Sequence, residues 1–282
     1  MKNKRLGVSL LAALTLLTVS ACSGEPETES APASSTTSSA PDQNLVRTQL
    51  DRAVDKTAKK YHAQVGVAIS AGDDTIAAGD KGEGPVWSTI KVPIAIAALK
   101  DGADKSLVDL AIKESDNDAA YSLWSQVQWY EGSADKAVRD LLDDHGSHAD
   151  IHDTAFGYSK WPLKDQAVFG AQLPCIEEAD YVHKVLKDIV SWQKVGLSKE
   201  KQTRAKSGWG LDDEENEYTY RQFGVHEVAG KRVGIALSVV TDGENYAEAE
   251  PAVDYLAHQL VDIVEAGVDE GNIEPAAQCE DR

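Results

Sequence analysis

Two groups of short β-rich stretches, separated by a long helical segment, constrain the fold of this chain most. Within 63–80, AQVGVAIS and TIAAGD are joined by a Gly-Asp-Asp turn and are expected to form a hairpin. Within 204–240, RAKSGWG, YRQFGVHEV and KRVGIALSVV are expected to form three strands. Helical patterns occupy 44–61 and 248–267. We therefore predict an α+β fold: an antiparallel sheet of about five strands flanked by the N- and C-terminal helices, with an inserted all-helical lobe at about 103–200.

The N-terminus has the pattern of a targeting segment. Lys2, Lys4 and Arg5 precede the apolar stretch LGVSLLAALTLLTV, which is short for a membrane span and has the charged start of a signal peptide. The stretch ends in VSAC, which resembles the lipobox of bacterial lipoproteins and would make Cys22 the lipid-modified first residue of the mature chain. The alternative is an ordinary cleaved signal peptide.

These features divide the chain into four parts. Residues 1–22 are the predicted lipoprotein signal peptide, and 23–43 have a Ser/Thr/Pro-rich composition without apolar periodicity, which predicts a flexible tether. One large domain is expected at 44–268, followed by a C-terminal tail at 269–282.

The remaining cysteines and the charge indicate compartment and partners. If Cys22 carries lipid, Cys175 and Cys279 remain as a pair in an oxidising compartment, where a disulfide would tie the tail to the domain. Two unpaired thiols are the alternative. The formal net charge of −19 argues against nucleic acid or anionic lipid headgroups as partners.

Ser88 and Lys91 stand one helical turn apart at the start of the run VWSTIKVPIAIAALK. The same Ser-x-x-Lys spacing recurs at 133–136, 191–194 and 198–201, where a solvated helical turn explains it. The run after Ser88 differs because IAIAAL is apolar on every face, as in a helix buried in a core. Pro93 predicts an irregular first turn, since proline has no N–H to donate. A lysine buried in such a helix needs a chemical reason.

Two further triplets follow in order: Ser115-Asp116-Asn117 in the helical middle and Lys206-Ser207-Gly208 on the first of the late strands. Together with Ser88-x-x-Lys91, the order S-x-x-K, S-D-N, K-[S/T]-G resembles the serine β-lactamase and penicillin-binding protein (DD-peptidase) superfamily, and STIKVP resembles its class A-like secreted members. The resemblance covers essentially the whole chain after residue 44, because the order of strands and helices agrees as well.

The resemblance gives Ser88 and Lys91 a chemical role. A serine hydroxyl is a poor nucleophile until a base takes its proton, and Lys91 on the same helix face is the expected base. An apolar site containing a second cation, Lys206, would lower the pKa of Lys91. The resemblance implies that Ser115 relays a proton to the leaving nitrogen, and that the backbone N–H groups of Ser88 and Trp209 form the oxyanion hole.

The other motif positions are implied to bind substrate. Asn117 would hold the amide carbonyl of the substrate, while Lys206 and Ser207 would bind its carboxylate. Glycine at 208 would let the substrate backbone lie against the strand. A helix N-cap is the structural alternative for Ser115 and Asn117.

Three departures from the class A pattern bear on activity. The interval from Ser88 to Ser115 is short, which implies a trimmed helical lobe and a more open cleft. No glutamate occurs between Glu131 and Glu177, where class A β-lactamases place the residue that activates the deacylating water. The aspartates at 150 and 153 are shorter substitutes that would need new placement. KSGWG also resembles the third motif of class D enzymes, whose active-site lysine carries a carbamate, although Ser-Asp-Asn is not the class D pattern.

Several residues outside the three motifs are weaker candidates for a metal site or for substrate binding. His145, His148 and His152 could bind zinc together with nearby aspartates, but their spacing fits no known zinc motif, so we expect a solvated loop and no metal. Arg221 could reach the substrate carboxylate from the second late strand. Trp87 and Trp209 flank the motifs and could form walls of the cleft or pack in the core.

The sequence thus predicts a lipid-anchored, extracytoplasmic serine acyl-transfer hydrolase without cofactor, acting as a monomer on D-alanyl cell-wall peptides or β-lactams. Its membrane contact would be the lipid on Cys22. One alternative is a genuine β-lactamase with a different deacylation route. Another is a non-catalytic envelope protein that binds peptidoglycan, although two buried lysines without a function would be costly.

Overall fold

The computed structural model describes residues 42–212, 215–277 and 279, and these residues form one α+β unit. Its five strands form a single antiparallel sheet in the order β2-β1-β5-β4-β3, so β3 lies at one edge. The strands are β1 (Gln64–Ala71), β2 (Asp74–Gly79), β3 (Thr203–Asp212), β4 (Glu217–Val228) and β5 (Lys231–Asp242). The predicted sheet and its strand count are confirmed.

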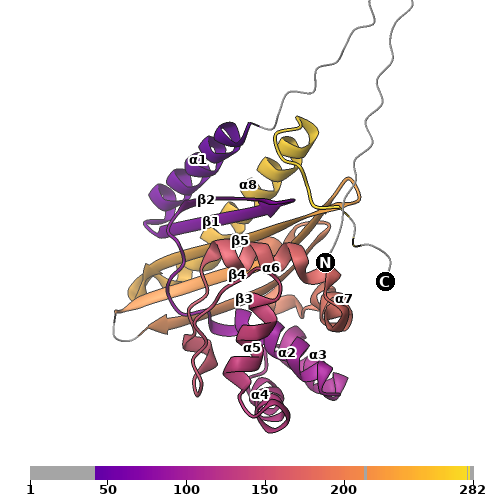
Figure 1. The fold of residues 1–282 in the computed structure, drawn as a ribbon. Coiled ribbons are helices and arrows are strands. Elements are labelled where there is room, and N and C mark those ends of the chain that lie inside the picture. Colours follow the sequence, from indigo (N-terminus) through magenta and orange to yellow (C-terminus); the bar gives the residue numbers. More distant parts are fainter. Residues whose placement is uncertain (1–41, 213–214, 278, 280–282) are drawn as a thin grey trace, which may run out of the picture. The chain divides into compact units, whose positions relative to one another are not determined.

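Helices cover both faces of the sheet (Figure 1). On one face lie the first and last helices, α1 (Gln43–Tyr61) and α8 (Ala249–Asp269), as predicted from their apolar periodicity. On the other face lies α6 (Leu163–Gln172), and beyond it the other helices of the inserted lobe. These are α2 (Lys91–Lys100), α3 (Lys105–Lys113), α4 (Asn117–Glu131), α5 (Ala134–Asp143) and α7 (Asp180–Val185).

Short 3-10 turns fill much of the second half of the lobe. They are η2 (Phe156–Tyr158), η3 (Leu173–Cys175), η4 (Glu177–Ala179), η5 (Leu186–Asp188), η6 (Ser191–Gln193) and η7 (Gly196–Lys199), with η1 (Trp87–Ile90) before α2 and η8 (Gly243–Glu248) before α8. α6 ends at Gln172 and η3 follows it directly. Gly196, with φ of 54°, interrupts any helix through 191–199.

The ends of the described unit are held by local contacts. Asp42 caps α1 by accepting hydrogen bonds from the backbone N–H groups of Asn44 and Leu45, so the helix begins one residue before the predicted boundary. The signal peptide, Cys22 and nearly all of the tether lie outside the described residues. None of the helices in the described part of the chain combines the length and apolar character needed to cross a bilayer.

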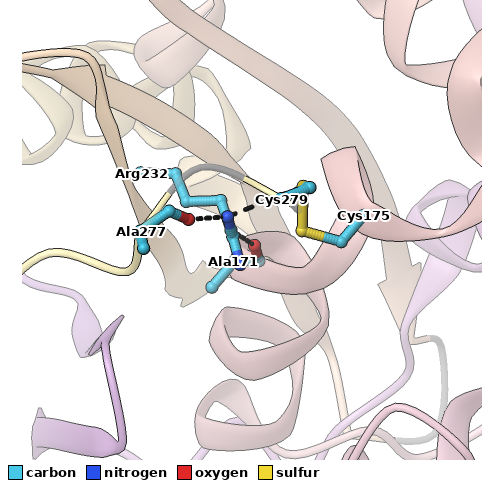
Figure 2. Close-up of a disulfide and its surroundings, with 5 residues drawn as sticks. All are labelled: Ala171, Cys175, Arg232, Ala277 and Cys279. Carbon is cyan, nitrogen blue, oxygen red and sulfur yellow. Dashed lines mark hydrogen bonds between the residues drawn. A yellow bond between two sulfur atoms is a disulfide. The ribbon is translucent and has the colours of Figure 1, made fainter. Parts of the chain in front are cut away.

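Cys175 and Cys279 are joined in a disulfide that ties the C-terminal segment to the lobe (Figure 2). Arg232 of β5 holds the same segment: its side chain donates to the carbonyl oxygens of Ala277 and Ala171, the latter at 2.6 Å, and contacts Cys279 Sγ at 3.6 Å. The tail beside the disulfide is therefore attached to both the sheet and α6.

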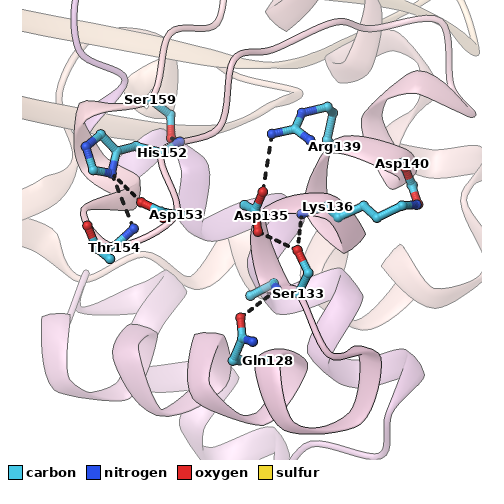
Figure 3. A network of polar contacts seen from close by, with 11 residues as sticks. Gln128, Ser133, Asp135, Lys136, Arg139, Asp140, His152, Asp153, Thr154 and Ser159 are labelled. Carbon is cyan, nitrogen blue, oxygen red and sulfur yellow. Dashed lines mark hydrogen bonds and ion pairs between the residues drawn. The ribbon is translucent and has the colours of Figure 1, made fainter.

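Ser133 and Lys136 have the same Ser-x-x-Lys spacing as Ser88 and Lys91, but Ser133 caps a helix. Its hydroxyl accepts a hydrogen bond from the backbone N–H of Lys136 at 3.3 Å and donates to Asp135 (Figure 3). Ser133 is thus the N-cap of α5. Ser133→Ala is therefore expected to destabilise the protein by about 1 kcal/mol, which lowers Tm by about 2–4 °C. Thermal unfolding measures this loss.

The matched control is Ser122→Ala in the interior of α4, where the exposed serine bonds only the carbonyl of Asp118. Alanine favours a helix interior, so this control is expected to leave Tm unchanged or slightly higher. Equal Tm values for the two variants would show that the cap contributes nothing.

Candidate active site

Ser88 and Lys91 are positioned by the junction between η1 and α2. The backbone N–H of Lys91 donates to the carbonyl of Ser88, so the two residues sit on one tight turn. Trp87, before Ser88, has φ of 49°, a left-handed conformation that is uncommon outside glycine. The irregular first turn predicted from Pro93 is present as η1, and Pro93 itself lies in the first turn of α2, where its missing N–H costs little.

Lys91 is buried, with 1% of its surface exposed. Its ammonium donates to the carbonyl oxygen of Ser115 at 2.5 Å, to Asn117 Oδ1 at 2.7 Å and, more weakly, to Ser115 Oγ at 3.4 Å. Burial lowers the pKa of Lys91 to about 8, although the nearby carboxylate of Asp116 opposes the shift. With a pKa of about 8, roughly a tenth of Lys91 is neutral at pH 7, and the neutral form is the one that a general base requires.

Lys206 on β3 is fully buried on the opposite side of Ser115. Its ammonium donates to Ser115 Oγ at 2.9 Å, to the carbonyl of Ser207 at 3.0 Å and to Gln193 Oε1 at 3.4 Å. Burial, and then the charge of Lys91, holds the pKa of Lys206 well below its usual range. Burial is therefore the main cause of the lowered pKa of both lysines.

Ser115 consequently joins the two lysines. Its hydroxyl is within hydrogen-bonding distance of both ammonium groups, and its φ of 55° places it in the left-handed region just before α4. Asp116, rather than Ser115 or Asn117, is the N-cap of α4, because its carboxylate accepts from the N–H of Ala119 at 2.7 Å. Ser115 and Asn117 are therefore free of the capping role that was the structural alternative.

Gly208 permits close packing of β3 against η1. A Cβ atom at this position would lie 2.7 Å from both the backbone nitrogen of Ser88 and the carbonyl oxygen of Val86. The glycine therefore accommodates the chain's own backbone around Ser88, and its role toward the substrate backbone stays a prediction. The approach brings the backbone of Ser88 beside β3, in which Trp209 is the next residue.

Ser207 does not line the cleft as predicted for a carboxylate ligand. It is 1% exposed, and its Oγ accepts a hydrogen bond of 2.7 Å from Nε2 of Gln222, the residue directly opposite on β4. Successive side chains of a strand point to opposite faces, so Lys206 reaches Ser115 while Ser207 faces Gln222. The hydroxyl is thus occupied within the protein.

Ser88, Lys91 and Asn117 open into a cleft with a volume of about 300 Å³. Its other walls are Trp87, Tyr121, residues 155–158 and Trp209, so both tryptophans that flank the motifs line it. No carboxylate lines this cleft among the described residues. The side chains proposed to replace the class A glutamate, at 150 and 153, are exposed and lie outside the lining.

Arg221 is a structural residue, which corrects the hypothesis that it binds the substrate carboxylate. It is completely buried, and its guanidinium donates to the carbonyl oxygens of Trp161 at 2.8 Å and Gly84 at 2.9 Å. Three longer bonds, of 3.1–3.2 Å, reach the carbonyls of Gly82 and Pro85 and the side chain of Gln166. Burial lowers the pKa of Arg221 to about 10, so it remains charged at neutral pH.

The three loop histidines form local contacts. His148 Nδ1 lies 2.7 Å from Asp143, which raises the pKa of His148, and His145 Nδ1 lies 2.8 Å from the carbonyl of Leu141. His152 Nδ1 accepts from the backbone N–H groups that follow it (Figure 3). Within the described residues, no three His, Cys, Asp or Glu side chains converge in a group that could hold a metal ion.

Several residues that shape this site were not predicted from the sequence. Gln193 bridges the carbonyl of Lys113 and the ammonium of Lys206, and Gln222 fixes Ser207. Tyr121 and Tyr158 line the cleft from distant segments. Position in the sequence alone gives no signal for these residues. For Gln222, strand alternation from Lys206-Ser207 would have indicated a polar partner once the register was known.

Comparison by sequence gives no relative: no known family pattern matches the chain, and no curated protein matches it. Solved structures do match. The TLA-3 extended-spectrum β-lactamase is 15% identical with a TM-score of 0.63, over 77% of this chain and 99% of that one. A β-lactamase from Chitinophaga pinensis is 16% identical with a TM-score of 0.60, over 78% and 100% of the two chains.

PBP-A is a further structural neighbour, 15% identical with a TM-score of 0.59, over 79% of this chain and 97% of that one. A mutant of PBP-A has been solved as an acyl-enzyme complex with penicillin G. Both kinds of neighbour are matched over nearly their full length. The chain therefore has the fold of the serine β-lactamase and penicillin-binding protein superfamily.

Proposed function

We propose that this protein is a serine acyl-transfer hydrolase that forms an acyl-enzyme at Ser88 on D-alanyl cell-wall peptides and on β-lactams. The observation that carries the proposal is the placement of Ser115 between two buried lysines, with Ser88, Lys91 and Asn117 opening into one cleft. These groups come from three separate segments, and burying two lysines without a use would be costly.

In the proposed acylation, Lys91 takes the hydroxyl proton of Ser88 while Ser88 Oγ forms a bond to the substrate carbonyl carbon. The backbone N–H groups of Ser88 and Trp209 stabilise the negative charge that develops on the carbonyl oxygen. The carbon–nitrogen bond then breaks, Ser115 gives its hydroxyl proton to the leaving nitrogen, and Lys91 returns the proton that it took from Ser88 to Ser115. Asn117 orients the substrate amide, and Lys206 holds Ser115 in place. Water later cleaves the Ser88 ester.

The cleft supports a penicillin-binding peptidase over a fast β-lactamase. Hydrolysis of the ester needs a base to activate water, and no carboxylate lines the cleft among the described residues. The ester formed with a β-lactam should therefore be lost slowly. The location belongs to the proposal too: an extracytoplasmic monomer, held by a lipid on Cys22 and a tether at 23–43, with one catalytic domain at 44–268.

Intact-protein mass spectrometry tests this function. The full chain in detergent is mixed with penicillin G, sampled over time, and compared with Ser88→Ala. We expect a mass increase equal to one penicillin that depends on Ser88 and persists after free drug is removed. An adduct that disappears while hydrolysed penicillin accumulates would identify a β-lactamase instead. Absence of any adduct with several β-lactams would favour a non-catalytic envelope protein.

A further inference from the structure

The open space of the cleft beside Ser88 is bounded mainly by aromatic rings. The rings come from η1, α4, η2 and β3, which are far apart in the sequence. They belong to Trp87, Tyr121, Phe156, Tyr158 and Trp209. We call these five residues the aromatic wall. Such a set of rings around a reactive serine indicates a preference in what the cleft binds.

Part of the aromatic wall is fixed where η2 packs on η1. The rings of Trp87 and Tyr158 have centroids 5.2 Å apart and are inclined at 57°. On its other side, the Trp87 indole lies against Gly210 of β3, where an added Cβ would be 2.8 Å from three ring atoms. Trp87 is therefore held between β3 and Tyr158, and its position does not depend on a ligand.

The rest of the aromatic wall is supported in the same way. Tyr121 contacts Phe156, with ring centroids 4.7 Å apart. Trp209 stacks on Tyr220 of β4 at 5.4 Å, with an angle of 16° between the rings. Rings held in advance lose little conformational freedom when a ligand arrives, so their contact with it contributes more to binding.

Two rings of the aromatic wall remain open to solvent. Tyr158 is 53% exposed and Tyr121 is 49% exposed, although both are large and partly apolar. Apolar surface that gathers in a cleft commonly marks a binding site. Both rings lie beside the proposed nucleophile, so a bound substrate would cover them.

The cleft offers little to an acidic group. Among the described lining residues the one charged side chain is Lys91, which is 1% exposed and donates to Ser115 and Asn117. The faces of aromatic rings carry partial negative charge. A carboxylate in this space would therefore lose its hydration without gaining a cation, whereas a flat apolar group would gain ring contacts.

We propose that the aromatic wall binds the acyl side of the substrate and selects an aryl or other flat apolar group there over a carboxylate. The inference rests on the proposed function, since it requires acylation of Ser88. Ser115 and Lys206 do not line the cleft, and Ser115 contacts Lys91, which does. The leaving-group side of the substrate faces Ser115, which protonates the leaving nitrogen. The acyl side, which stays bonded to Ser88, therefore contacts the aromatic wall.

Three penicillins that share one nucleus test the selection. Penicillin G carries a phenylacetyl group, carbenicillin adds a carboxylate to it, and 6-aminopenicillanic acid lacks the acyl group. The second-order rate of Ser88 acylation in the full chain is measured for each by mass spectrometry. We expect penicillin G to react about tenfold faster than either of the others, the upper range for contacts between aromatic rings.

Substitution of Tyr158 links any preference to the aromatic wall. Tyr158→Ala is expected to lower the ratio of rates for penicillin G and 6-aminopenicillanic acid about three- to tenfold, whereas Tyr158→Phe keeps the ring and the ratio. Tyr246→Ala is the matched control, because Tyr246 is 60% exposed and lies outside the cleft. It should leave the ratio unchanged.

The outcomes separate the two proposals. Equal rates for all three compounds, or an unchanged ratio in Tyr158→Ala, would overturn the selection by the aromatic wall while the Ser88 adduct still forms. Loss of the adduct with every compound would overturn the proposed function itself. Thermal unfolding of each variant confirms that the comparison is made between folded proteins.

Discussion

Replacing Lys91 by methionine is expected to slow acylation of Ser88 by penicillin about 10²–10⁴-fold, the usual contribution of a general base. The change removes the group that accepts the serine proton. Methionine has a similar length and fits the buried site, but it leaves the oxygens of Ser115 and Asn117 without this donor, so thermal unfolding accompanies the kinetics to show that the variant is folded. The acylation rate, followed by mass spectrometry, measures the loss.

The pH dependence of the acylation rate shows whether Lys91 acts as a base or only as a fixed positive charge. With the pKa of Lys91 lowered to about 8, the neutral fraction rises with pH, so acylation by the wild type should accelerate about tenfold per unit up to pH 8 and then level. Lys91→Arg keeps a positive charge that does not titrate in this range. It should be as slow as Lys91→Met and lack this rise. A fast Lys91→Arg variant would contradict the role of Lys91 as base.

The lowered pKa of Lys91 also makes the free energy of unfolding depend on pH. Lys91 titrates near 8 in the folded state and near 10.5 in the unfolded state, so between these values the unfolded state binds more protons. The free energy of unfolding therefore receives a contribution from Lys91 that rises with pH from about 8 to 10.5. Lys91→Met should remove this contribution, which offers a check that does not depend on catalysis.

The order of elements could be predicted because it depends on local patterns. The strands alternate or are apolar throughout, and the terminal helices have apolar positions at helical spacing, so the sheet and its covering helices followed from the sequence. The segment after α7 could not be predicted in detail. Its β-branched residues Val190 and Val195 and the left-handed Gly196 break it into 3-10 turns, whose ends depend on packing against β3 and α8.

The reactive groups could be anticipated from motifs, but the directions of their neighbours could not. Ser88, Lys91, Ser115 and Lys206 meet because the motifs lie at fixed places on the fold. Ser207 turns to Gln222, a contact that depends on strand register. Their catalytic roles stay predictions until acylation is measured.

The aromatic wall was still less accessible to sequence reasoning. Phe156 and Tyr158 follow a segment rich in polar residues. Their position beside Trp87 depends on contacts between residues that are distant in the sequence. The backbone of Lys160 pairs with both Asp150 and Pro85, which brings the loop against the segment before Ser88. An isolated bridge between loop residues leaves no periodic pattern in the sequence.

Arg221 explains how that segment is held and leads to the largest expected effect on stability. Its guanidinium is the buried donor for oxygens on two loops and one helix: Gly82, Gly84 and Pro85 in the loop before Ser88, Trp161 in the loop after η2, and Gln166 in α6. Arg221→Met would leave these oxygens without their donor. Each unsatisfied buried group costs about 1–3 kcal/mol, so a total loss of about 3–5 kcal/mol is expected even if water enters to replace some bonds.

Urea unfolding measures this effect, with Arg139→Met as the matched control. Arg139 is partly exposed and pairs with Asp135 at 3.4 Å, so its loss should cost less than about 1 kcal/mol. Arg221→Lys keeps the charge but loses the planar fork that reaches both loops at once, so it should remain destabilised. If Arg221→Met and Arg139→Met had the same unfolding free energy, the two loops would be held by other contacts. Ser88 would then owe its position to the packing of Gly208 against η1 rather than to the buried guanidinium.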